Sequence, residues 1–430
     1  MRVITKGKLT EHQMVFSVVI GMMLLSMYLP YQRSLTYIYQ IAVVGIVFFL
    51  CKASSYAILP IMLLSTTRSY IAVSTQAEFQ EYLGLNNSIM LIIMLLLLVL
   101  ALKKRQFMLP ISNGAGYMVL FSALIMMSRL WADNLDEYTS AFAPICLIYI
   151  TMPMLIETDS DVTISKVAFV LSGFFAALGI VPHLLSVGNI YQFGVIVDRN
   201  YQSSFLLICI LQAITLMIDQ KDRLRWFHIL GCWLVIGLDM FIIISSASRS
   251  AILALIIAGG VYLILNLKHF KTEISVILVA GIMLLYLNEL GTFDFILERF
   301  SLANVQTGNG RTELWSAYLQ GFMKGNILQK LFGHGLSGQA VFGRVAHNLF
   351  VSILYSFGIV GIFLFIVPVF FCIKNAIKTR HSYELISLIP ILFMCCTIEP
   401  YYRIEFAVYL SVMVGVTSYY NARSVERYEQ

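Results

Sequence analysis

Residues 88–102 read SIMLIIMLLLLVLAL, a run without a single charge, and Lys103, Lys104 and Arg105 follow it directly. A strand of a membrane barrel would alternate apolar and polar residues, whereas this run is apolar throughout. Such a run predicts a membrane-spanning helix, which satisfies its backbone hydrogen bonds internally. The whole chain of 430 residues agrees, because 59% of it is hydrophobic and only 12% is charged, against about a quarter in an ordinary globular protein.

Apolar runs separated by polar breaks predict an all-α polytopic membrane protein with about fourteen transmembrane helices. The helices would form a single domain over residues 1–430, with a large external loop over 291–346 that contains short helices. The expected spans cover residues 13–30, 35–51, 56–73, 87–102, 109–128, 139–156, 163–182, 201–218, 227–245, 250–267, 274–290, 347–373, 384–398 and 405–420.

The distribution of Lys and Arg predicts the orientation, since short cytoplasmic loops carry an excess of both. With both termini in the cytoplasm, basic loops such as 103–105 and 374–380 lie inside. An uncleaved first span is expected, because no small-residue cleavage site follows the apolar run after the basic start. The seven cysteines lie in or beside apolar runs and predict no disulfide.

On this map the polar clusters all fall on the external side. They comprise residues 198–200, the turn 245–250, the loop 291–346, the pair His347-Asn348, and residues 399–403. An error of one span between any two clusters would place them on opposite faces. Their agreement therefore favours one functional face, with the remaining helices as its scaffold.

Three arginines in these clusters are candidates for binding an anion. Arg199 follows Asp198 at the mouth of a span, where a salt bridge and an anion contact are equally open interpretations. Arg249 lies in SSASRS, a tight turn of small residues before a helix, and a helix start beside Arg suits an anion. Arg311 opens GRTELW and a predicted amphipathic helix to Phe322, where simple solvation is the alternative.

His347 and Asn348 open the longest late span, and they are the candidates for acid–base chemistry. A histidine at a helix start is more often a structural hydrogen-bonder, but its ordinary pKa near neutrality suits a general base. Asn348 would orient His347 or hold a sugar hydroxyl. His334, in the glycine-rich stretch 332–338, is a weaker candidate. Glu399 is an acid at the end of a span, where acids are costly and often functional, although it could simply pair with Arg403.

Other signatures are missing from the sequence. It contains no phosphate-binding P-loop, no zinc-binding HExxH and no external acidic DxD motif, so no metal and no cofactor are expected. Charged residues do not recur within the spans as they would along an ion path, Arg68 and Asp239 being the main exceptions.

At SASRSA, GRTELW and the glycine-rich loop leading to HNLFVSILYSFGIVG, the sequence resembles the O-antigen polymerase and O-antigen ligase superfamily. The resemblance covers the second half, residues 198–403. It implies a GT-C-like glycosyltransferase of the bacterial inner membrane that acts at the periplasmic face without a metal. Its partners would be an undecaprenyl-diphosphate-linked glycan donor, an acceptor glycan and a chain-length regulator protein, with no nucleic acid.

The resemblance also implies residue roles. Arg199, Arg249 and Arg311 would hold the diphosphate, His347 would be the general base, and Asn348, Glu399 and His334 would support them. The expected count of about fourteen spans favours a polymerase, while a ligase that transfers the glycan to lipid A–core is the alternative. A lipid-linked oligosaccharide flippase would need polar groups along a path through many spans, and a non-catalytic scaffold would leave the external Arg and His unexplained.

Overall fold

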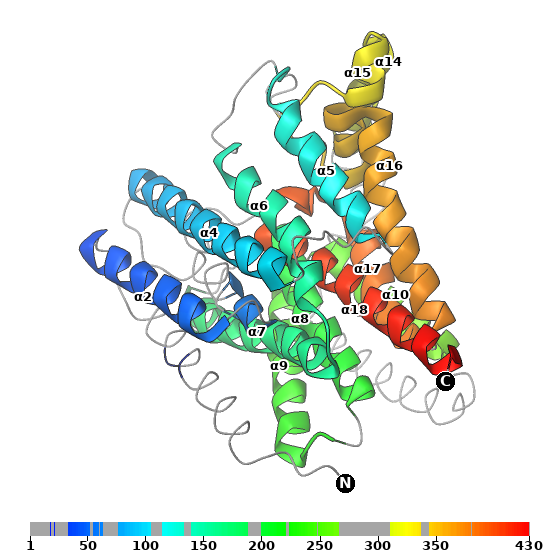
Figure 1. The fold of residues 1–430 in the computed structure, drawn as a ribbon. Helices are drawn as coiled ribbons and strands as arrows, with labels where there is room; N and C mark the ends of the chain where they lie inside the picture. The colour runs from blue at the N-terminus through cyan, green and yellow to red at the C-terminus, as the bar shows by residue number, and fades with distance from the viewer. Residues whose placement is uncertain are drawn as a thin grey trace, which may run out of the picture.

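The computed structural model describes residues 18, 21, 33–51, 55–59, 61–62, 76–104, 114–132, 139–187, 199–220, 223–246, 248–265, 310–336, 344–379 and 381–429. Most of the chain in these ranges is helical, and no strand occurs in them. The helices form a bundle in which α14 and α15 project from one end, beside α16 (Figure 1).

The first half of the bundle contains α2 (Arg33–Cys51), α4 (Gln76–Lys104), α5 (Ala115–Ser128), α6 (Thr139–Thr151), α7 (Asp159–Val187) and α8 (Arg199–Asp219). The second half contains α9 (Trp226–Ser245), α10 (Arg249–Leu265), α14 (Arg311–Lys324), α15 (Ile327–Phe332), α16 (Leu349–Lys378), α17 (Leu385–Cys395) and α18 (Ile404–Glu429). Short 3-10 turns are η1 (Ser55–Ala57), η2 (Met152–Leu155), η6 (Ser382–Glu384) and η7 (Pro400–Tyr402).

Five of these helices are long and apolar enough to cross a membrane, so the chain is a multi-pass membrane protein. They cover Asn87–Lys104, Asp159–Val181, Arg199–Asp219, Trp226–Ser245 and Leu349–Lys378, and four shorter apolar helices accompany them. The expected count of about fourteen spans is not confirmed. The expected span 274–290, most of 13–30 and 56–73, and residues 291–309 and 337–343 of the loop 291–346 lie outside the described residues.

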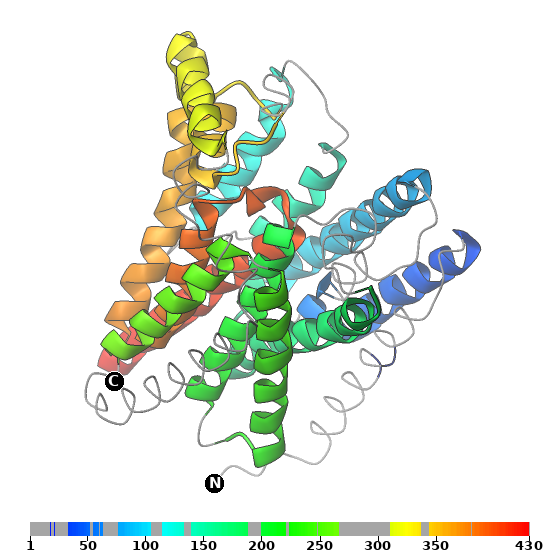
Figure 2. The ribbon, with the colours of Figure 1, turned by 180° about the vertical axis from the view of Figure 1, so that it is seen from behind.

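Helix α8 packs against α7, α9, α10 and α17 and so lies within the bundle, which Figure 2 shows from behind. Its side chains are buried on nearly every face, including the polar Gln212 and Thr215. Gln212 donates to Ser387 Oγ of α17 at 2.9 Å, which in turn lies 2.6 Å from the Tyr409 hydroxyl of α18. Because buried polar groups are stable only when paired, these bonds fix three helices against one another.

Helix α16 is not one straight span. Gly358 inside it has φ 68° and ψ −165°, outside the helical region, and divides it into two segments. The second segment, residues 359–378, is about 30 Å long at 1.5 Å per residue, which matches the apolar core of a bilayer. The expected single span over 347–373 is therefore replaced by a short first segment and a full-length second one.

The bend at Gly358 is filled by the segment that follows α15. A Cβ atom on Gly358 would overlap the carbonyl of Leu331, and one on Gly333 would overlap the backbone at Ser356 and Phe357. Two backbone bonds tie the segments together, from His334 N–H to the Tyr355 carbonyl and from Gly335 N–H to the Ser356 carbonyl, both 2.9 Å long. Glycine at both contact points permits this close approach.

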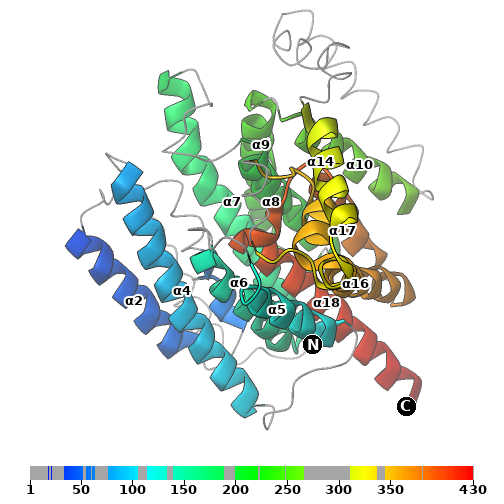
Figure 3. The ribbon, with the colours of Figure 1, turned by 90° about the horizontal axis from the view of Figure 1, so that it is seen from above.

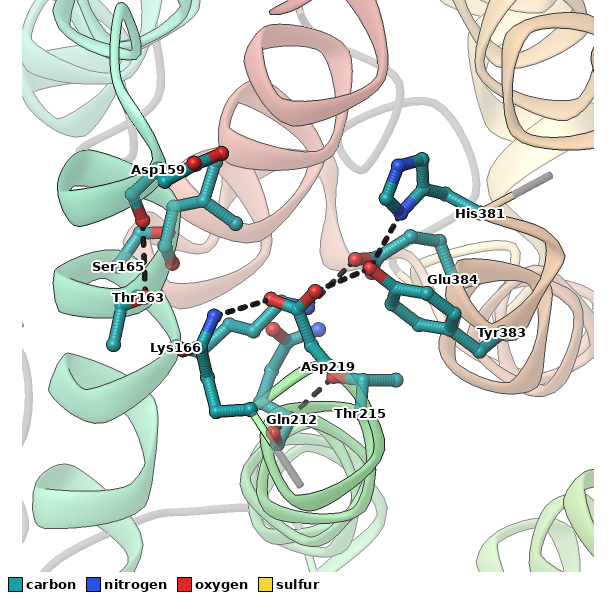
Figure 4. Close-up of polar contacts among 12 residues, drawn as sticks. Asp159, Thr163, Ser165, Lys166, Gln212, Thr215, Asp219, His381, Tyr383 and Glu384 are labelled. Carbon is teal, nitrogen blue, oxygen red and sulfur yellow. Dashed lines mark hydrogen bonds and ion pairs between the residues drawn. The ribbon is translucent and has the colours of Figure 1, made fainter. Parts of the chain in front are cut away.

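One end of the bundle, called here the Lys166 end, is held by a buried ionic network (Figure 4). Lys166 Nζ lies 2.6 Å from Glu384 Oε1 and 3.5 Å from Asp219 Oδ2. Tyr383 donates to Asp219 at 2.6 Å, and His381 Nδ1 lies 2.7 Å from the Tyr383 hydroxyl. Burial lowers the pKa of His381, so this imidazole is neutral at pH 7. The network joins α7, α8 and η6 at one level.

Further contacts at the Lys166 end join helix termini that the expected topology places on one side. Arg423 near the end of α18 donates to Asp159 at the start of α7 at 2.5 Å, and Lys378 donates to Asn421 at 3.1 Å. Lys104, at the end of α4, forms an ion pair with Glu157. The loops that carry the excess of positive charge therefore share one end of the molecule.

Replacing Gly358 with alanine is expected to destabilise the protein, because the new Cβ would overlap Leu331 and the backbone angle suits only glycine. We expect the free energy of unfolding to fall by about 1–3 kcal/mol, the usual cost of such backbone strain. A lower thermal unfolding midpoint in detergent measures this loss. Gly237→Ala is the matched control, since a Cβ there meets nothing within 4 Å. Equal midpoints for the two variants would contradict the described bend.

Candidate active site

Helix α14 forms hydrogen bonds with the segment that precedes α16, residues 344–348. The indole of Trp315 donates to the Ala346 carbonyl at 2.7 Å, and the hydroxyl of Tyr318 donates to the Arg344 carbonyl at 2.8 Å. Tyr318 is itself buried against Tyr355 of α16, with ring centroids 5.1 Å apart in an edge-on arrangement. Two rigid aromatic side chains therefore fix the backbone that presents His347.

His347 occupies a strained position at the start of α16. Its φ of 51° is positive, and among the described residues it is the one non-glycine residue with a positive φ. Asn348 is the N-cap, because its side-chain oxygen accepts from Phe350 N–H at 3.0 Å and from Val351 N–H at 3.2 Å. Strain of this kind persists only where neighbouring contacts enforce it, and it gathers at functional sites.

Glu399 lies beside the same helix start. Its side chain is only 2% exposed, and Ser352 of α16 donates to its Oε2 at 3.2 Å. Burial raises the pKa of Glu399 to about 7, while Ser352 and the nearby backbone N–H groups of residues 346–348 oppose the rise. Glu399 therefore exchanges a proton near neutral pH, next to the backbone of His347.

The first turn of α8 reaches the same place. The backbone N–H of Glu399 donates to the Tyr201 hydroxyl at 3.4 Å, and the guanidinium of Arg403 lies 4.7 Å above the Tyr201 ring. Sequence spacing leaves open a pair between Glu399 and Arg403, but in the structure Glu399 faces Ser352 and Arg403 covers Tyr201. The cation–π contact fixes the short η7 segment onto α8.

The turn between α9 and α10 joins the first turn of α8 through two hydroxyl contacts. Ser248 donates to Asn200 Oδ1 at 3.1 Å, and Ser246 Oγ lies 2.9 Å from Ser203 Oγ. Asn200 follows Arg199, and Ser248 precedes Arg249. Both arginines are half-buried and begin neighbouring helices.

Three of the helices that begin at this end have arginine as their first residue. They are α8 with Arg199, α10 with Arg249 and α14 with Arg311. The contacts described above connect these helix starts to one another and to the start of α16, and Figure 3 shows them grouped when the molecule is viewed from above. Helix N-termini carry partial positive charge and free N–H groups, so the group is suited to binding an anion.

Five of the seven sequence-predicted residues fall into two sets. His347, Asn348 and Glu399 meet at the start of α16, and Arg199 and Arg249 are joined through Asn200 and Ser248. Arg311 lies one turn before Trp315, which contacts the carbonyl preceding His347. His334 has a structural place, because its ring stacks on Tyr355 at 4.4 Å and 11°.

Four side chains that organise this site were not singled out from the sequence: Tyr201, Trp315, Tyr318 and Ser352. Ser352 lies one helical turn after Asn348, and that spacing was the signal that could have indicated it. Tyr201 contacts a residue 198 positions away, so no local pattern predicts it. Across the described ranges, no three His, Cys, Asp or Glu side chains gather as metal ligands do.

Fold and candidate site together define a helical multi-pass membrane protein in which several helices begin at one end, three of them with arginine. Residues 230–366 match the family model described as O-antigen ligase, which confirms the resemblance to the O-antigen polymerase and ligase superfamily. The matched segment contains Arg249, Arg311 and His347, while Arg199 and Glu399 lie outside it. No curated protein matches the chain.

Replacing Glu399 with glutamine is expected to change how stability depends on pH. Because the folded pKa of about 7 lies above the unfolded value of 4.5, the wild type loses stability as pH rises from about 4.5 to 7. A neutral glutamine removes this loss, which is of the order of 3 kcal/mol. Unfolding midpoints in detergent at pH 5 and pH 8 measure it, and parallel pH curves for both proteins would contradict the assignment.

Proposed function

We propose that the protein is a glycosyltransferase that polymerises undecaprenyl-diphosphate-linked O-antigen, or related polysaccharide, repeat units. The observation that carries this proposal is the gathering of three arginine-headed helix starts beside a strained histidine. The negative charge of a lipid diphosphate suits the three arginine-headed helix starts. An acceptor hydroxyl needs a base, and the histidine would supply it.

The arginines would bind the donor. Arg199, Arg249 and Arg311 each combine a guanidinium fork, which matches phosphate oxygens, with the N-terminus of its own helix. As the bond from the anomeric carbon to the diphosphate breaks, the departing electron pair adds negative charge to the phosphates. Fixed positive groups stabilise that developing charge more than the ground state, which lowers the barrier.

His347 would act as the general base. Its imidazole takes the proton of the acceptor hydroxyl while the hydroxyl oxygen attacks the anomeric carbon, and the lipid diphosphate leaves. Glu399 would position His347 through the backbone at the start of α16, and Asn348 would keep that helix start in place. No metal is needed in this scheme, because the arginines carry the charge stabilisation.

The proposed setting is the inner membrane of a bacterium, with the site at the periplasmic face and both termini in the cytoplasm. Support comes from the Lys166 end, where Lys104, Lys378 and Arg423 gather, because an excess of short-loop Lys and Arg is typical of the cytoplasmic side. Helix α8 separates the two ends, since Asn200 lies in its first turn and Asp219 is its last residue.

A second candidate acceptor is lipid A–core, because the matching family model is described as O-antigen ligase. Lipopolysaccharide electrophoresis of a deletion strain distinguishes the two activities. A core carrying a single repeat indicates a polymerase, whereas bare core with accumulated lipid-linked polymer indicates a ligase. An unchanged lipopolysaccharide ladder would count against both.

His347→Ala is expected to lower glycan transfer by about 10²- to 10⁴-fold, the usual contribution of a general base. Complementation of the deletion strain, followed by electrophoresis, measures the loss, and an immunoblot checks insertion. His228→Ala is the control, because His228 lies at the start of α9, away from the site. A wild-type ladder from His347→Ala would refute the proposed base.

Arg249→Ala and Arg311→Ala are each expected to reduce transfer by about 10²- to 10³-fold, as removal of a transition-state donor does. Lysine at either position should restore little, because a point charge does not replace a planar fork. Initial rates against donor concentration in purified protein measure the effect. Arg223→Ala is the control, because Arg223 is exposed in the turn after α8, at the opposite end of the bundle. Full activity in both lysine variants would contradict bidentate phosphate binding.

A further inference from the structure

An apolar ridge runs along the last turns of α14 and along α15. Its six exposed side chains are Leu319, Met323, Ile327, Leu328, Leu331 and Phe332. Ile327 is 75% exposed, Met323 66% and Leu328 64%. The opposite face of α14 is packed, because Tyr318 and Phe322 lie against α16. Exposed apolar side chains this close together mark an interaction surface.

The ridge lies at the level where the membrane-crossing segments begin. Leu331 and Gly333 contact the bend at Gly358, which starts the 30 Å second segment of α16. Gly335, two residues after Gly333, touches the backbone of Ser128 and Ala132, where α5 ends. The contacts with α16 and α5 therefore place α15 at one boundary of the apolar core of the bilayer.

The ridge is also continuous with a surface that faces lipid. Below the bend, α16 exposes an apolar stripe at helical spacing: Ile359, Phe363, Ile366 and Phe370. Beyond α5, Leu130 and Trp131 are exposed beside the segment that follows α15. Tryptophan is enriched at membrane–water interfaces, because its ring is apolar and its N–H is polar.

The charges beside the ridge suit the surface of a bilayer. Lys324 is exposed in the last turn of α14, and Lys330 is half-buried within α15. Both flank Met323, Ile327 and Leu328, while the acid of this element, Glu313, lies in the first turn of α14. Lysines next to an exposed apolar face are the composition of an interfacial helix on anionic lipid.

We propose that the last turns of α14 together with α15 form an interfacial anchor, whose apolar ridge inserts into the bilayer surface while Lys324 and Lys330 meet phospholipid phosphates. The anchor carries Trp315 and Tyr318 on its other face. Its depth in the lipid therefore sets the height of the segment that presents His347. This inference stands on the exposed side chains and does not depend on glycan transfer.

The test places a fluorophore on the ridge of the full-length protein. Leu328→Cys and Ile327→Cys are labelled with an environment-sensitive maleimide, in a background whose seven native cysteines are replaced by alanine. The protein is reconstituted in phosphatidylethanolamine vesicles, with or without phosphatidylglycerol, that contain lipids brominated high on the acyl chains. Gln320→Cys is the control, because Gln320 is exposed on α14 among polar neighbours.

Labels at positions 327 and 328 are expected to shift to the blue and lose emission to the brominated lipid, and the label at 320 is not. More quenching with phosphatidylglycerol supports the role of the lysines, and equal quenching in both lipids overturns it. Equal quenching at 320 and 328, or none at 328, overturns the anchor. Cross-linking of Leu328→Cys to a second copy, without quenching, shows a protein interface instead and also overturns it.

A second measurement covers the case in which the cysteine-free background does not fold. In native membranes, a membrane-impermeant maleimide should react with Gln320→Cys and spare Leu328→Cys, with wild type as the blank. Of the six native cysteines whose side chains the structure describes, five are buried and Cys396 is half-buried. Equal reaction at both introduced positions would overturn the anchor.

Discussion

The constraint on which the site depends is electrostatic: several helices begin at one place, and their N-termini carry charge of the same sign. Arg199, Arg249 and Arg311 increase this positive charge, since each begins its helix. Among the acids near these helix starts, Glu399 is buried, and its pKa of about 7 makes its charge depend on pH near neutrality. The electrostatics of this end therefore combine the positive helix starts with one buried carboxyl group that titrates near pH 7.

The two ends of the bundle differ in how their polar and charged groups are paired. At the Lys166 end, one buried ammonium meets two carboxylates, and the hydroxyl of Tyr383 donates to Asp219. At the other end, polar contacts between helices use hydroxyls, amides and backbone groups, and the guanidinium groups remain half-buried at helix starts. The first arrangement fixes the helices through buried ion pairs, whereas the second joins the helix starts through hydroxyl contacts.

Sequence patterns predicted the helices well where the apolar run was long. The run at 88–102 lies within α4, the predicted helix from Arg311 appears as α14, and His347-Asn348 directly precede α16, as expected of a pair that opens a late span. The bend at Gly358 was missed, because a glycine within an apolar run resembles any other helical glycine until Leu331 lies against it.

The site was only partly predictable for a related reason. His347 and the arginines were found because polar residues stand out at the ends of apolar runs. Their supporting contacts join distant positions, such as Tyr201 with Glu399, and only the packed bundle brings these together. The strain at His347 likewise has no sequence signature, since it results from Trp315 and Asn348 holding the backbone on either side.

The ionic network at the Lys166 end has a consequence for how the chain is made. A ribosome delivers α7 and then α8 to the membrane, so Asp219 follows Lys166 closely, whereas Glu384 arrives 218 residues later. During that interval, Asp219 is the carboxylate of this network that has already been synthesised and can pair with the ammonium of Lys166. Biogenesis therefore begins with one ion pair and adds the second carboxylate only once the late helices have been inserted.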